Sequence, residues 1–539
     1  MSVELFSGLH GFGFLFFPLL HFYKPVQSGN GGISEVQMEL YQALTVLAIL
    51  ILACACASKL SSWINMPVLV VFLAVGMLAG SEGIGKIPFE DPHIANIIGS
   101  IAMAFILFSG GFDTKWSSVK SVVGYGGILS SIGVLLTALF VGLFTWFFLR
   151  WQLPGRMIPL SWCLLLGSIV SSTDAAAVFS ILRSKSVSLR GKLQPLLEFE
   201  SGSNDPMAAF LTVFLIPVAI AEAKSGVSVG FSVYWQILPS FLMRMTLGLI
   251  LGIAWGKLAV WLFNKINFEY DGLYYVLGVA TVFLSFGCTE LFQGNGFMAI
   301  YVTGLVMGNS KFIYHNGLGR FHDGMAWLMQ VVLFTMLGLL ATPSLVWDAR
   351  YIGLVVAAFL MLAARPLAVF LCMMGSRFSY NERLLVSWVG LRGGAPVMLA
   401  TFPWVAGVEQ HTLMFHIVFF IVLTSVVLQG MTIMPVAKAL HLDLPLRIHP
   451  RVPLEFENTG NLDGDTREFE VLPGAPFIGR TLATLGLPAG ALVLLIRRGG
   501  GFVVPHGNTE IMVNDALMIL GSPDVLAKTG KVLGVPSEE

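Results

Sequence analysis

Long apolar stretches, separated by short polar ones, run through most of this 539-residue chain. A helix needs about 20 apolar residues to cross a bilayer, and the stretches suffice for about thirteen such helices. The predicted spans lie near residues 39–62, 65–80, 94–112, 120–149, 157–182, 195–222, 230–263, 272–292, 295–309, 323–342, 350–375, 382–405 and 411–438. The pattern therefore predicts an all-α, polytopic membrane domain over residues 39–442.

The two ends of the chain depart from this pattern. Residues 1–38 contain one apolar stretch, 12–22, which is too short to span a bilayer and follows no basic residue, so it is a poor signal peptide. We expect an extension at the membrane surface. Residues 443–464 are polar and contain prolines and a glycine, which is typical of a linker.

Residues 465–536 alternate between apolar and polar positions. The predicted strands are 469–471, 491–496, 502–505 and 516–520, with a short helical turn at 481–485. Short alternating segments bounded by glycine and proline predict a small α+β domain.

Charge supports this division and gives it an orientation. Charged residues make up only 12% of the chain, and 31 Lys+Arg balance 31 Asp+Glu, so no bulk charge favours nucleic acid as a partner. Cytoplasmic loops of membrane proteins collect lysine and arginine. With the first span entering from outside, most loop cations fall inside, among them Lys115, Lys120 and Arg190. The C-terminal domain is then cytoplasmic, and the spans contact membrane lipid.

Asp174 lies in the middle of a predicted span, within SSTDAAAVFS. A charge at the bilayer centre costs about 2.5–3.5 kcal/mol on insertion scales, so one that remains is functional or paired. The hydroxyls of Ser171, Ser172 and Thr173 precede it. Such groups satisfy the backbone where a helix breaks, or bind a cation. A simple helix cap is the alternative, but apolar residues flank the motif on both sides, which favours an ion site.

Asp205 and Glu200 lie in the first half of the next span, within ESGSNDP. Being five residues apart, they point to different faces of a helix, so one partner cannot serve both. Pro206 leaves a carbonyl one turn earlier without its helical partner. This segment is therefore a second oxygen-rich place where a helix is loosened.

Two arginines also lie in predicted spans, and each should have a carboxylate or carbonyl partner. Arg365 occurs in AARPLAVFL, and Arg392 in GLRGGAP, where two glycines and a proline interrupt a helix. The broken spans 157–182 and 382–405 fall one in each half of the membrane domain. That arrangement is typical of an inverted repeat.

Five segments of the membrane domain occur in a specific order: SSTDAAAVFS, ESGSNDPMA, GNGFMAIYVTGLVMGN, AARPLAVFL and SWVGLRGGAPVMLATFP. In this order they resemble the NhaP-type monovalent cation:proton antiporters, and within that group the CvrA-like potassium/proton antiporters of bacteria. The resemblance covers about residues 40–440. It implies thirteen spans, two crossing broken helices, a homodimer and a place in the bacterial inner membrane.

The resemblance also implies roles for residues. Asp205 would bind a proton and a cation in turn, and Thr173 and Asp174 would help to ligate the monovalent cation at the crossing. Ser201 would be a further oxygen ligand. Asn204 stands where electrogenic relatives have a second aspartate, which implies electroneutral exchange.

Three further implications concern support of the site. Glu200 is expected to pair with Arg365, and Arg392 to stabilise the second broken helix. Some relatives carry a third carboxylate near the position of Ser109, where this chain has LFSGG and no carboxylate.

The tail carries a second resemblance, through GRTLATLGLPAGALVLLIRRGG and VPHGNTEIMVNDALMILGSPDVL. These segments resemble the RCK C-terminal (TrkA-C) domain, a dimeric ligand-sensing module of ion transport proteins. A nucleotide or dinucleotide effector is implied, which Arg497, Arg498 and His506 could contact. For the two arginines, a solvated hairpin turn is the alternative.

Together these features predict an electroneutral antiporter that exchanges cytoplasmic K+ for H+ by alternating access, regulated by its tail, for pH, potassium and volume homeostasis. Na+/H+ exchange on the same fold stays open, because carbonyl and carboxylate sites select cations by their geometry. An RCK-gated channel is a further alternative, since VVGYGG at 122–127 is similar to a selectivity loop, but it occurs once and without a pore-helix pattern. No motif indicates an enzyme or a resident cofactor, and His315 and His322 are expected in a solvated loop.

Overall fold

The computed structural model describes residues 33–64, 67–154, 158–184, 187–225, 231–445, 465–471, 474–475, 477–499 and 501–533. It divides into two compact units: a helical unit, which takes in the chain up to Ser310 and then Gly319–Ile448, and a second unit of Lys311–Leu318 and His449–Glu539. The N-terminal extension predicted for 1–38 lies almost wholly outside the described residues, as does most of the linker predicted for 443–464.

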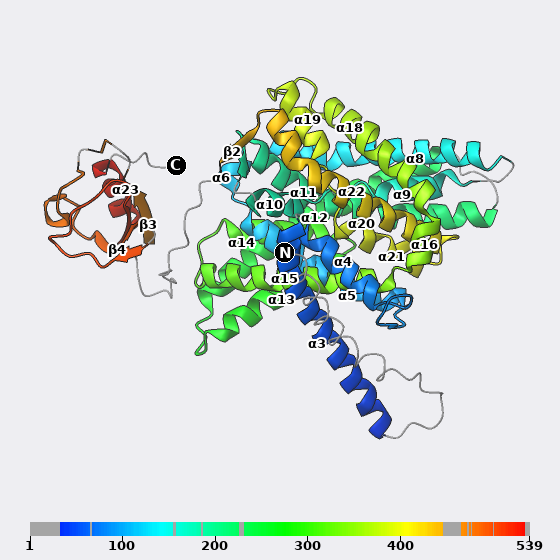
Figure 1. Cartoon of the computed structure of the whole chain (residues 1–539), viewed down its shortest axis with the longest axis horizontal. Coiled ribbons are helices and arrows are strands. Elements are labelled where there is room, and N and C mark those ends of the chain that lie inside the picture. Colours follow the sequence, from blue (N-terminus) through cyan, green and yellow to red (C-terminus); the bar gives the residue numbers. More distant parts are fainter. Residues whose placement is uncertain are drawn as a thin grey trace, which may run out of the picture. The chain divides into compact units, whose positions relative to one another are not determined.

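The first half of the helical unit runs from α3 to α11 (Figure 1). Its helices are α3 (Ile33–Ile64), α4 (Val68–Ala79), α5 (Pro92–Asp113), α6 (Trp116–Val119), α7 (Val123–Ile128), the π-helix η1 (Leu129–Gly133), α8 (Val134–Gln152), α9 (Leu160–Ile169), α10 (Ala175–Ser184) and α11 (Leu193–Ser225).

The second half runs from α12 to α22. Its helices are α12 (Phe231–Lys265), α13 (Gly272–Leu291), α14 (Gly296–Gly308), α15 (His315–Leu340), α16 (Pro343–Asp348), α17 (Arg350–Phe359), the π-helix η2 (Leu360–Ala364), α18 (Arg365–Cys372), α19 (Tyr380–Trp388), α20 (Gly394–Leu399), α21 (Thr401–Val405) and α22 (His411–Ala439).

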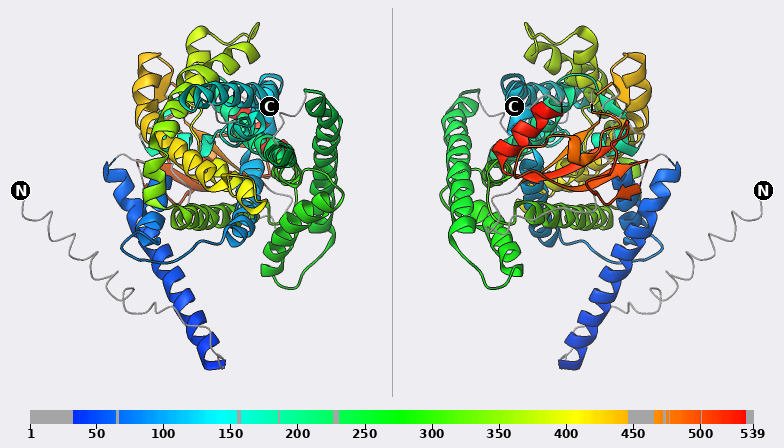
Figure 2. Two further views of the ribbon diagram at one scale, coloured as in Figure 1. Left: turned by 90° about the vertical axis from the view of Figure 1, so that its right-hand side faces the viewer. Right: turned by 90° about the vertical axis from the view of Figure 1, so that its left-hand side faces the viewer.

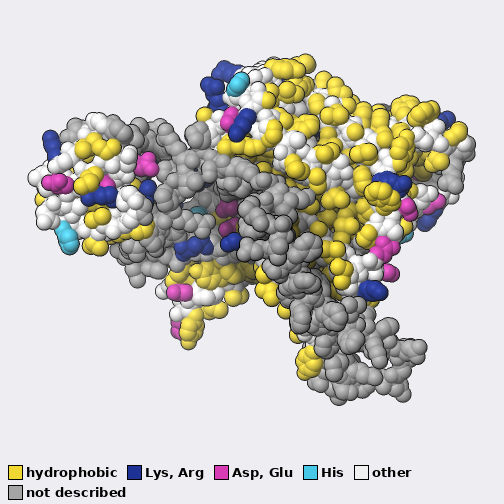
Figure 3. Space-filling model, viewed as in Figure 1, with side chains coloured by type: hydrophobic (Ala, Val, Ile, Leu, Met, Phe, Trp, Pro, Cys, Tyr) yellow, Lys and Arg dark blue, Asp and Glu magenta, His cyan; other side chains and the backbone are white. Residues whose placement is uncertain are grey.

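Apolar composition makes these helices, and local polar residues set where they begin. Asp91 accepts hydrogen bonds from the backbone of His93 and Ile94 at the start of α5, where proline also occupies the first helical position. Ser379 and Glu382 form a reciprocal capping box at the start of α19. Hydrophobic side chains cover most of the visible face of the helical unit, and charged ones lie mainly at its margins (Figure 3). Such a surface suits a lipid environment.

The all-α polytopic fold is confirmed, but the predicted number of long spans is too high. Among the described residues, nine helices are long and apolar enough to cross a membrane. The four other predicted spans correspond to shorter apolar helices: Val68–Ala79, Leu160–Ile169, Gly296–Gly308 and Gly394–Val405. Two of these predicted spans, 65–80 and 295–309, have fewer than 20 residues, and the other two, 157–182 and 382–405, are the spans predicted to be broken, where a short helix joins irregular backbone.

The chain repeats one order of elements. In the first half, a helix with a π-turn (α7–η1–α8) precedes a broken helix (α9 and α10) and a long helix (α11). In the second half, α17–η2–α18 precedes the broken α19–α20 and the long α22. These elements pack together and form what we call the core group. The two halves thus contain the same elements in the same order, as the predicted repeat requires.

A second group of helices packs beside the core group. It contains α4, α5, α12, α13, α14 and α15, with α14 packed against both α5 and α12. Close backbone approach joins α4 to α15, because a Cβ added to Gly76 would lie 2.1 Å from the Thr335 carbonyl oxygen. Helix α3 projects away from the rest of the helical unit along much of its length (Figures 1 and 2).

The helical unit also contains two short strands. Strand β1 (Val187–Leu189) pairs antiparallel with β2 (Asp443–Pro445), in a register that sets Val187 opposite Pro445. The first three residues of the predicted linker, 443–445, are therefore part of the helical unit.

The tail is a four-stranded antiparallel sheet with one helix. Its strands are β3 (Asp465–Glu470), β4 (Leu492–Arg498), β5 (Gly501–Val503) and β6 (Ala516–Gly521), in the order β3-β6-β4-β5, and α23 spans Pro523–Val532. A 3-10 turn at Leu482–Thr484 matches the predicted helical turn. Buried Phe469, Ile496, Leu517 and Leu526 form part of its core. The α+β prediction is confirmed, although α23 was not predicted.

Candidate functional site

The first helix break lies between α9 and α10, where residues 170–174 are not helical. Asp174 precedes α10 and accepts a hydrogen bond from the Ala177 amide at 3.0 Å, as an N-cap does. The predicted break at SSTD is therefore observed. The alternative interpretation of Asp174 as a helix cap is also correct in part, because Asp174 caps α10, the second half of the broken span.

The second break lies between α19 and α20, and it contacts the first. The Asp174 amide donates to the Leu391 carbonyl at 2.7 Å. Arg392, which is 1% exposed, donates from Nη1 to the carbonyls of Ser171 (2.7 Å) and Ser172 (2.6 Å). These carbonyls lie just after the C-terminal end of α9, where a cation is favourable. The expected crossing of two broken helices is thus present.

Glycine allows this close approach. A Cβ added to Gly393 would lie 2.1 Å from Asp174 Oδ2, a separation that atoms cannot adopt. The Arg392 amide is held in turn by Ser425 Oγ of α22 at 3.1 Å. The backbone of the second break therefore lies directly against the Asp174 carboxylate of the first.

Helix α11 brings the other carboxylate to the crossing. Ser172 Oγ donates a short hydrogen bond to Asp205 Oδ1. Ser201 Oγ accepts from the Ala175 amide at 2.9 Å and donates to the Thr173 carbonyl at 3.0 Å. These contacts place Asp205 and Ser201 against the first break.

Asn204 completes the set from the same helix. Its Nδ2 donates to Thr173 Oγ1, and the side chain is 0% exposed. The structure thus brings together all five residues predicted for the ion site: Asp205, Asp174, Thr173, Ser201 and Asn204. Carboxylate, hydroxyl and carbonyl oxygens are the ligands that hard cations prefer. The residues present therefore suit a monovalent cation as the transported substrate.

Glu200 points elsewhere on α11 and meets Arg365 at the start of α18. Glu200 Oε1 lies 2.6 Å from Arg365 Nη2, with side chains only 1% and 3% exposed. A Cβ added to Gly390 would lie 2.8 Å from Arg365 Nε, so the arginine also packs against the end of α19. The pair links three elements of the core group.

Two polar residues that connect the helices of the site to their neighbours were not predicted from the sequence. Glu222, near the end of α11, accepts from the Ser161 amide at 3.1 Å and from its hydroxyl, which caps α9. Asn295 of the second group donates to the Pro206 carbonyl at 3.0 Å, next to Asp205. Glu222 is the final residue of a predicted span, where a carboxylate usually meets water, so its burial was not expected.

The expectation for His322 is wrong. It lies within α15, 0% exposed, among Phe105, Phe108 and Phe321. Within the part of the chain that is described, neither ring nitrogen has a hydrogen-bond partner. Neighbouring charges made the segment look like a loop, but a helix can carry charges on one face and bury the other.

In the tail, both arginines are engaged by carboxylates. Arg497 Nη2 lies 2.7 Å from Glu468 Oε1, and Arg498 Nη2 lies 2.8 Å from Asp515 Oδ2. The hydrogen bond with Asp515 raises the pKa of Arg498 above its usual range. Adjacent strand residues point to opposite faces of a sheet, so the two guanidinium groups do not converge. The His506 side chain is exposed.

Two crossing breaks beside a half-buried carboxylate, inside a polytopic helical unit, define a secondary ion transporter. Residues 46–439 match the family described as sodium/hydrogen exchanger, transmembrane, and residues 466–534 match the TrkA-C domain. The chain belongs to the sodium/hydrogen exchanger family and carries a C-terminal TrkA-C domain. It is a multi-pass membrane antiporter, not an enzyme, and the resemblances drawn from its sequence are confirmed.

Characterised relatives cover most of the chain. It is 37% identical over 481 residues to the K(+)/H(+) antiporter NhaP of Alkalimonas amylolytica, a match that spans 88% of this chain and 80% of the relative. The K(+)/H(+) antiporter NhaP2 of Shewanella sp. (strain ANA-3) is 36% identical over 472 residues, 86% and 78% of the two chains.

A solved structure shows the same fold. The sodium proton antiporter MjNhaP1 from Methanocaldococcus jannaschii at pH 8 superposes with a TM-score of 0.62 and 24% identity, covering 75% of this chain and 99% of that chain.

Proposed function

We propose that the chain exchanges cytoplasmic K+ for H+ by alternating access, with one cation exchanged for one proton. Asp205 alternately binds the proton and the cation, while Thr173, Asp174 and Ser201 supply further oxygens. The observation that carries this proposal is the meeting of Asp205 with the first break through Ser172.

Competition for one carboxylate couples the two fluxes. A bare carboxylate is costly to move through an apolar barrier, whereas a carboxylate neutralised by a proton or a cation is much less so. Only loaded forms of the site therefore cross easily, and the exchange proceeds without a leak.

Asn204 supports an electroneutral exchange. Its amide donates to Thr173 Oγ1 and brings no second titratable charge beside Asp205. In everted vesicles, a permeant anion such as thiocyanate collapses the membrane potential, and the exchange rate should not change. Acceleration by thiocyanate would show that the exchange moves net charge.

Potassium is the proposed cation because the relatives with 36–37% identity are named K(+)/H(+) antiporters. Sodium is the second candidate, supported by the likeness to a sodium proton antiporter. Proton flux driven by K+, Na+, Rb+ and Li+ in turn distinguishes them.

Homodimerisation and regulation by the tail complete the proposal, and the TrkA-C match supports them. The effector is an anionic nucleotide or dinucleotide that meets His506 and one of the two arginines, Arg497 or Arg498, because these point to opposite faces of β4. To bind phosphate, that arginine would exchange its carboxylate partner for it.

The decisive experiment compares two substitutions of the same kind. Asp205→Asn should abolish cation-driven proton flux in proteoliposomes that report pH with a dye. Asp348→Asn, at an exposed position in α16, should leave the flux unchanged. Normal flux in Asp205→Asn would refute the assignment of the site.

A further inference from the structure

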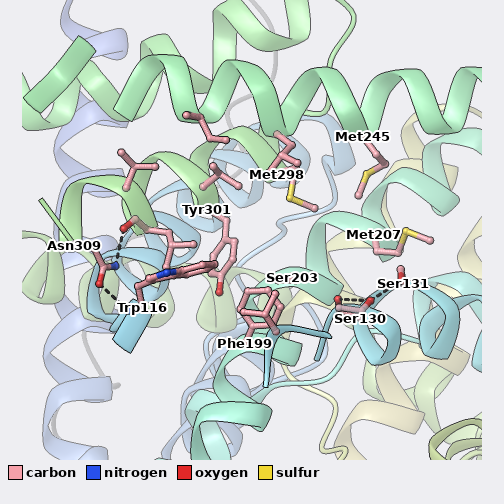
Figure 4. Close-up of a pocket in the computed structure, with 17 residues that line it drawn as sticks. Trp116, Ser130, Ser131, Phe199, Ser203, Met207, Met245, Met298, Tyr301 and Asn309 are labelled. Atoms are coloured by element: carbon pink, nitrogen blue, oxygen red, sulfur yellow. Dashed lines mark hydrogen bonds between the residues drawn. The ribbon is translucent and has the colours of Figure 1, made fainter. Parts of the chain in front are cut away.

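A cavity of about 590 Å³ lies between the core group and the second group of helices. Helices α7, η1 and α11 form one wall, and α12 and α14 form the other (Figure 4). Trp116 and Asn309 gather at one end, and Ser131 and Met207 at the opposite end. The cavity is therefore bounded by both groups.

This cavity is separate from the ion site. Phe199, Ser203 and Met207 line it from positions four residues apart on α11. Residues two positions along a helix are turned by about 200°, so Asp205 points away from the cavity and toward the broken helices. Any occupant would therefore not compete directly with the cation.

The walls favour an apolar occupant. None of the described residues that line the cavity is charged. The Ser131 hydroxyl donates to the Gly127 carbonyl at 2.5 Å, and both ends of the Asn309 amide are used by Trp116 and Thr114. The hydroxyl of Tyr301 also lines the cavity, and among the described residues it has no hydrogen-bond partner. It is a single polar group, whereas a water molecule needs two to four free polar partners.

The length of the cavity matches one leaflet of a bilayer. Met298 and Asn309 both line it, and eleven residues of α14 rise by roughly 16 Å at 1.5 Å each. Half of a hydrocarbon core of about 30 Å is about 15 Å. A lipid chain entering at Trp116 would therefore reach the far end of the cavity near the bilayer centre.

The open end carries groups that suit a lipid headgroup. Trp116 is 47% exposed there, and tryptophan favours the level of lipid headgroups. Exposed Lys115 and Lys120 flank α6 on the side predicted to be cytoplasmic. Exposed Lys257 lies one turn beyond Ile253, which lines the cavity. Lysines at this level attract anionic headgroups.

We propose that this cavity binds an acyl chain of an anionic phospholipid from the cytoplasmic leaflet, with its phosphate at Lys115, Lys120 and Lys257. The π-turn η1 forms part of the core wall at this point, and π-turns often occur at functional sites. If the proposed exchange moves the core group past the second group, the bound acyl chain must shift with each transport cycle. This effect of transport on the lipid rests on the proposed function.

Filling the cavity tests the proposal. The full-length protein is incubated with phosphatidylglycerol or phosphatidylcholine of identical chains, and native mass spectrometry counts bound lipid. A Cβ at Gly127 meets nothing within 4 Å, so Gly127→Leu should fold and reduce binding of both lipids roughly tenfold, equal to about 1.4 kcal/mol. Gly287→Leu, where a Cβ also meets nothing within 4 Å, is the control and should bind normally.

Two further variants make the outcomes distinct. Met298→Trp fills the cavity from the other wall and should give the same loss if Gly127→Leu folds poorly. The triple substitution Lys115→Gln, Lys120→Gln and Lys257→Gln should remove the preference for phosphatidylglycerol and leave phosphatidylcholine bound.

Unchanged binding in both filled variants would overturn the site, and equal binding of the two lipids by the unaltered protein would overturn the anionic headgroup. Asp205→Asn should bind lipid normally, because binding is measured without ion exchange. A failure of the exchange proposal is therefore separable from a failure of this one.

Discussion

Removing one partner of the Glu200–Arg365 ion pair should destabilise the protein far more than removing both. The two charges lie 2.6 Å apart and are almost completely buried, so neither has water as a substitute partner. Glu200→Leu leaves the Arg365 guanidinium buried in the core group without its partner, and Arg365→Met does the same to the Glu200 carboxylate. The double variant buries two apolar side chains in their place.

The burial sets the expected magnitudes. Breaking a buried pair by removing one partner costs about 3–5 kcal/mol, whereas replacing both partners by apolar residues of similar volume is roughly neutral. Each single variant should therefore lose about 3–5 kcal/mol of unfolding free energy, and the double variant less than about 1 kcal/mol. The coupling energy between the two positions is the difference between the loss in the double variant and the sum of the two single losses.

Unfolding by a denaturing detergent in mixed micelles measures these free energies, with tryptophan fluorescence as the signal. Glu269→Gln, at an exposed position, is the control and should change the free energy by less than about 0.5 kcal/mol. If the loss in the double variant equals the sum of the two single losses, the side chains are not coupled and the reasoning is refuted.

Three further predictions concern the breaks and the tail. Gly393→Ala places a Cβ 2.1 Å from a carboxylate oxygen of the first break and should abolish proton flux, while Gly110→Ala, where a Cβ meets nothing within 4 Å, should not. Arg392→Gln removes charged hydrogen bonds worth about 1.5–3 kcal/mol each, and should lower both unfolding free energy and flux. Asp515→Asn should speed proteolysis of the tail. Asp515 raises the pKa of Arg498 above its usual range, so the arginine is charged at both pH 6 and pH 9. The increase in proteolysis should therefore be the same at these two pH values.

Local chemistry made the breaks predictable. Hydroxyl residues before Asp174, and two glycines with a proline after Arg392, cannot sustain a regular helix in an apolar span, so both breaks fall where the sequence placed them. The contact between them joins residues more than 200 positions apart. Spacing along a chain does not encode that distance, and the crossing was expected only through resemblance.

Other features depend on tertiary packing alone. His322 has charged neighbours, and only the packing of α15 against aromatic rings of α5 buries it. Asn295 reaches Pro206 because α14 and α11 pack together across the two groups. The cavity is likewise a gap between side chains of six elements, so no single segment of sequence indicates it.

The two breaks stabilise each other, and this limits which helices can move during transport. Carbonyls left free at the end of α9 are satisfied by Arg392, and the Leu391 carbonyl accepts from the Asp174 amide. Each break thus supplies the partners that the other lacks in an apolar environment, where an unsatisfied backbone group is costly. Separating them would expose both sets of groups at once. Access to Asp205 should therefore alternate by movement of the core group as a body against α5, α12 and α14, with the crossing kept intact.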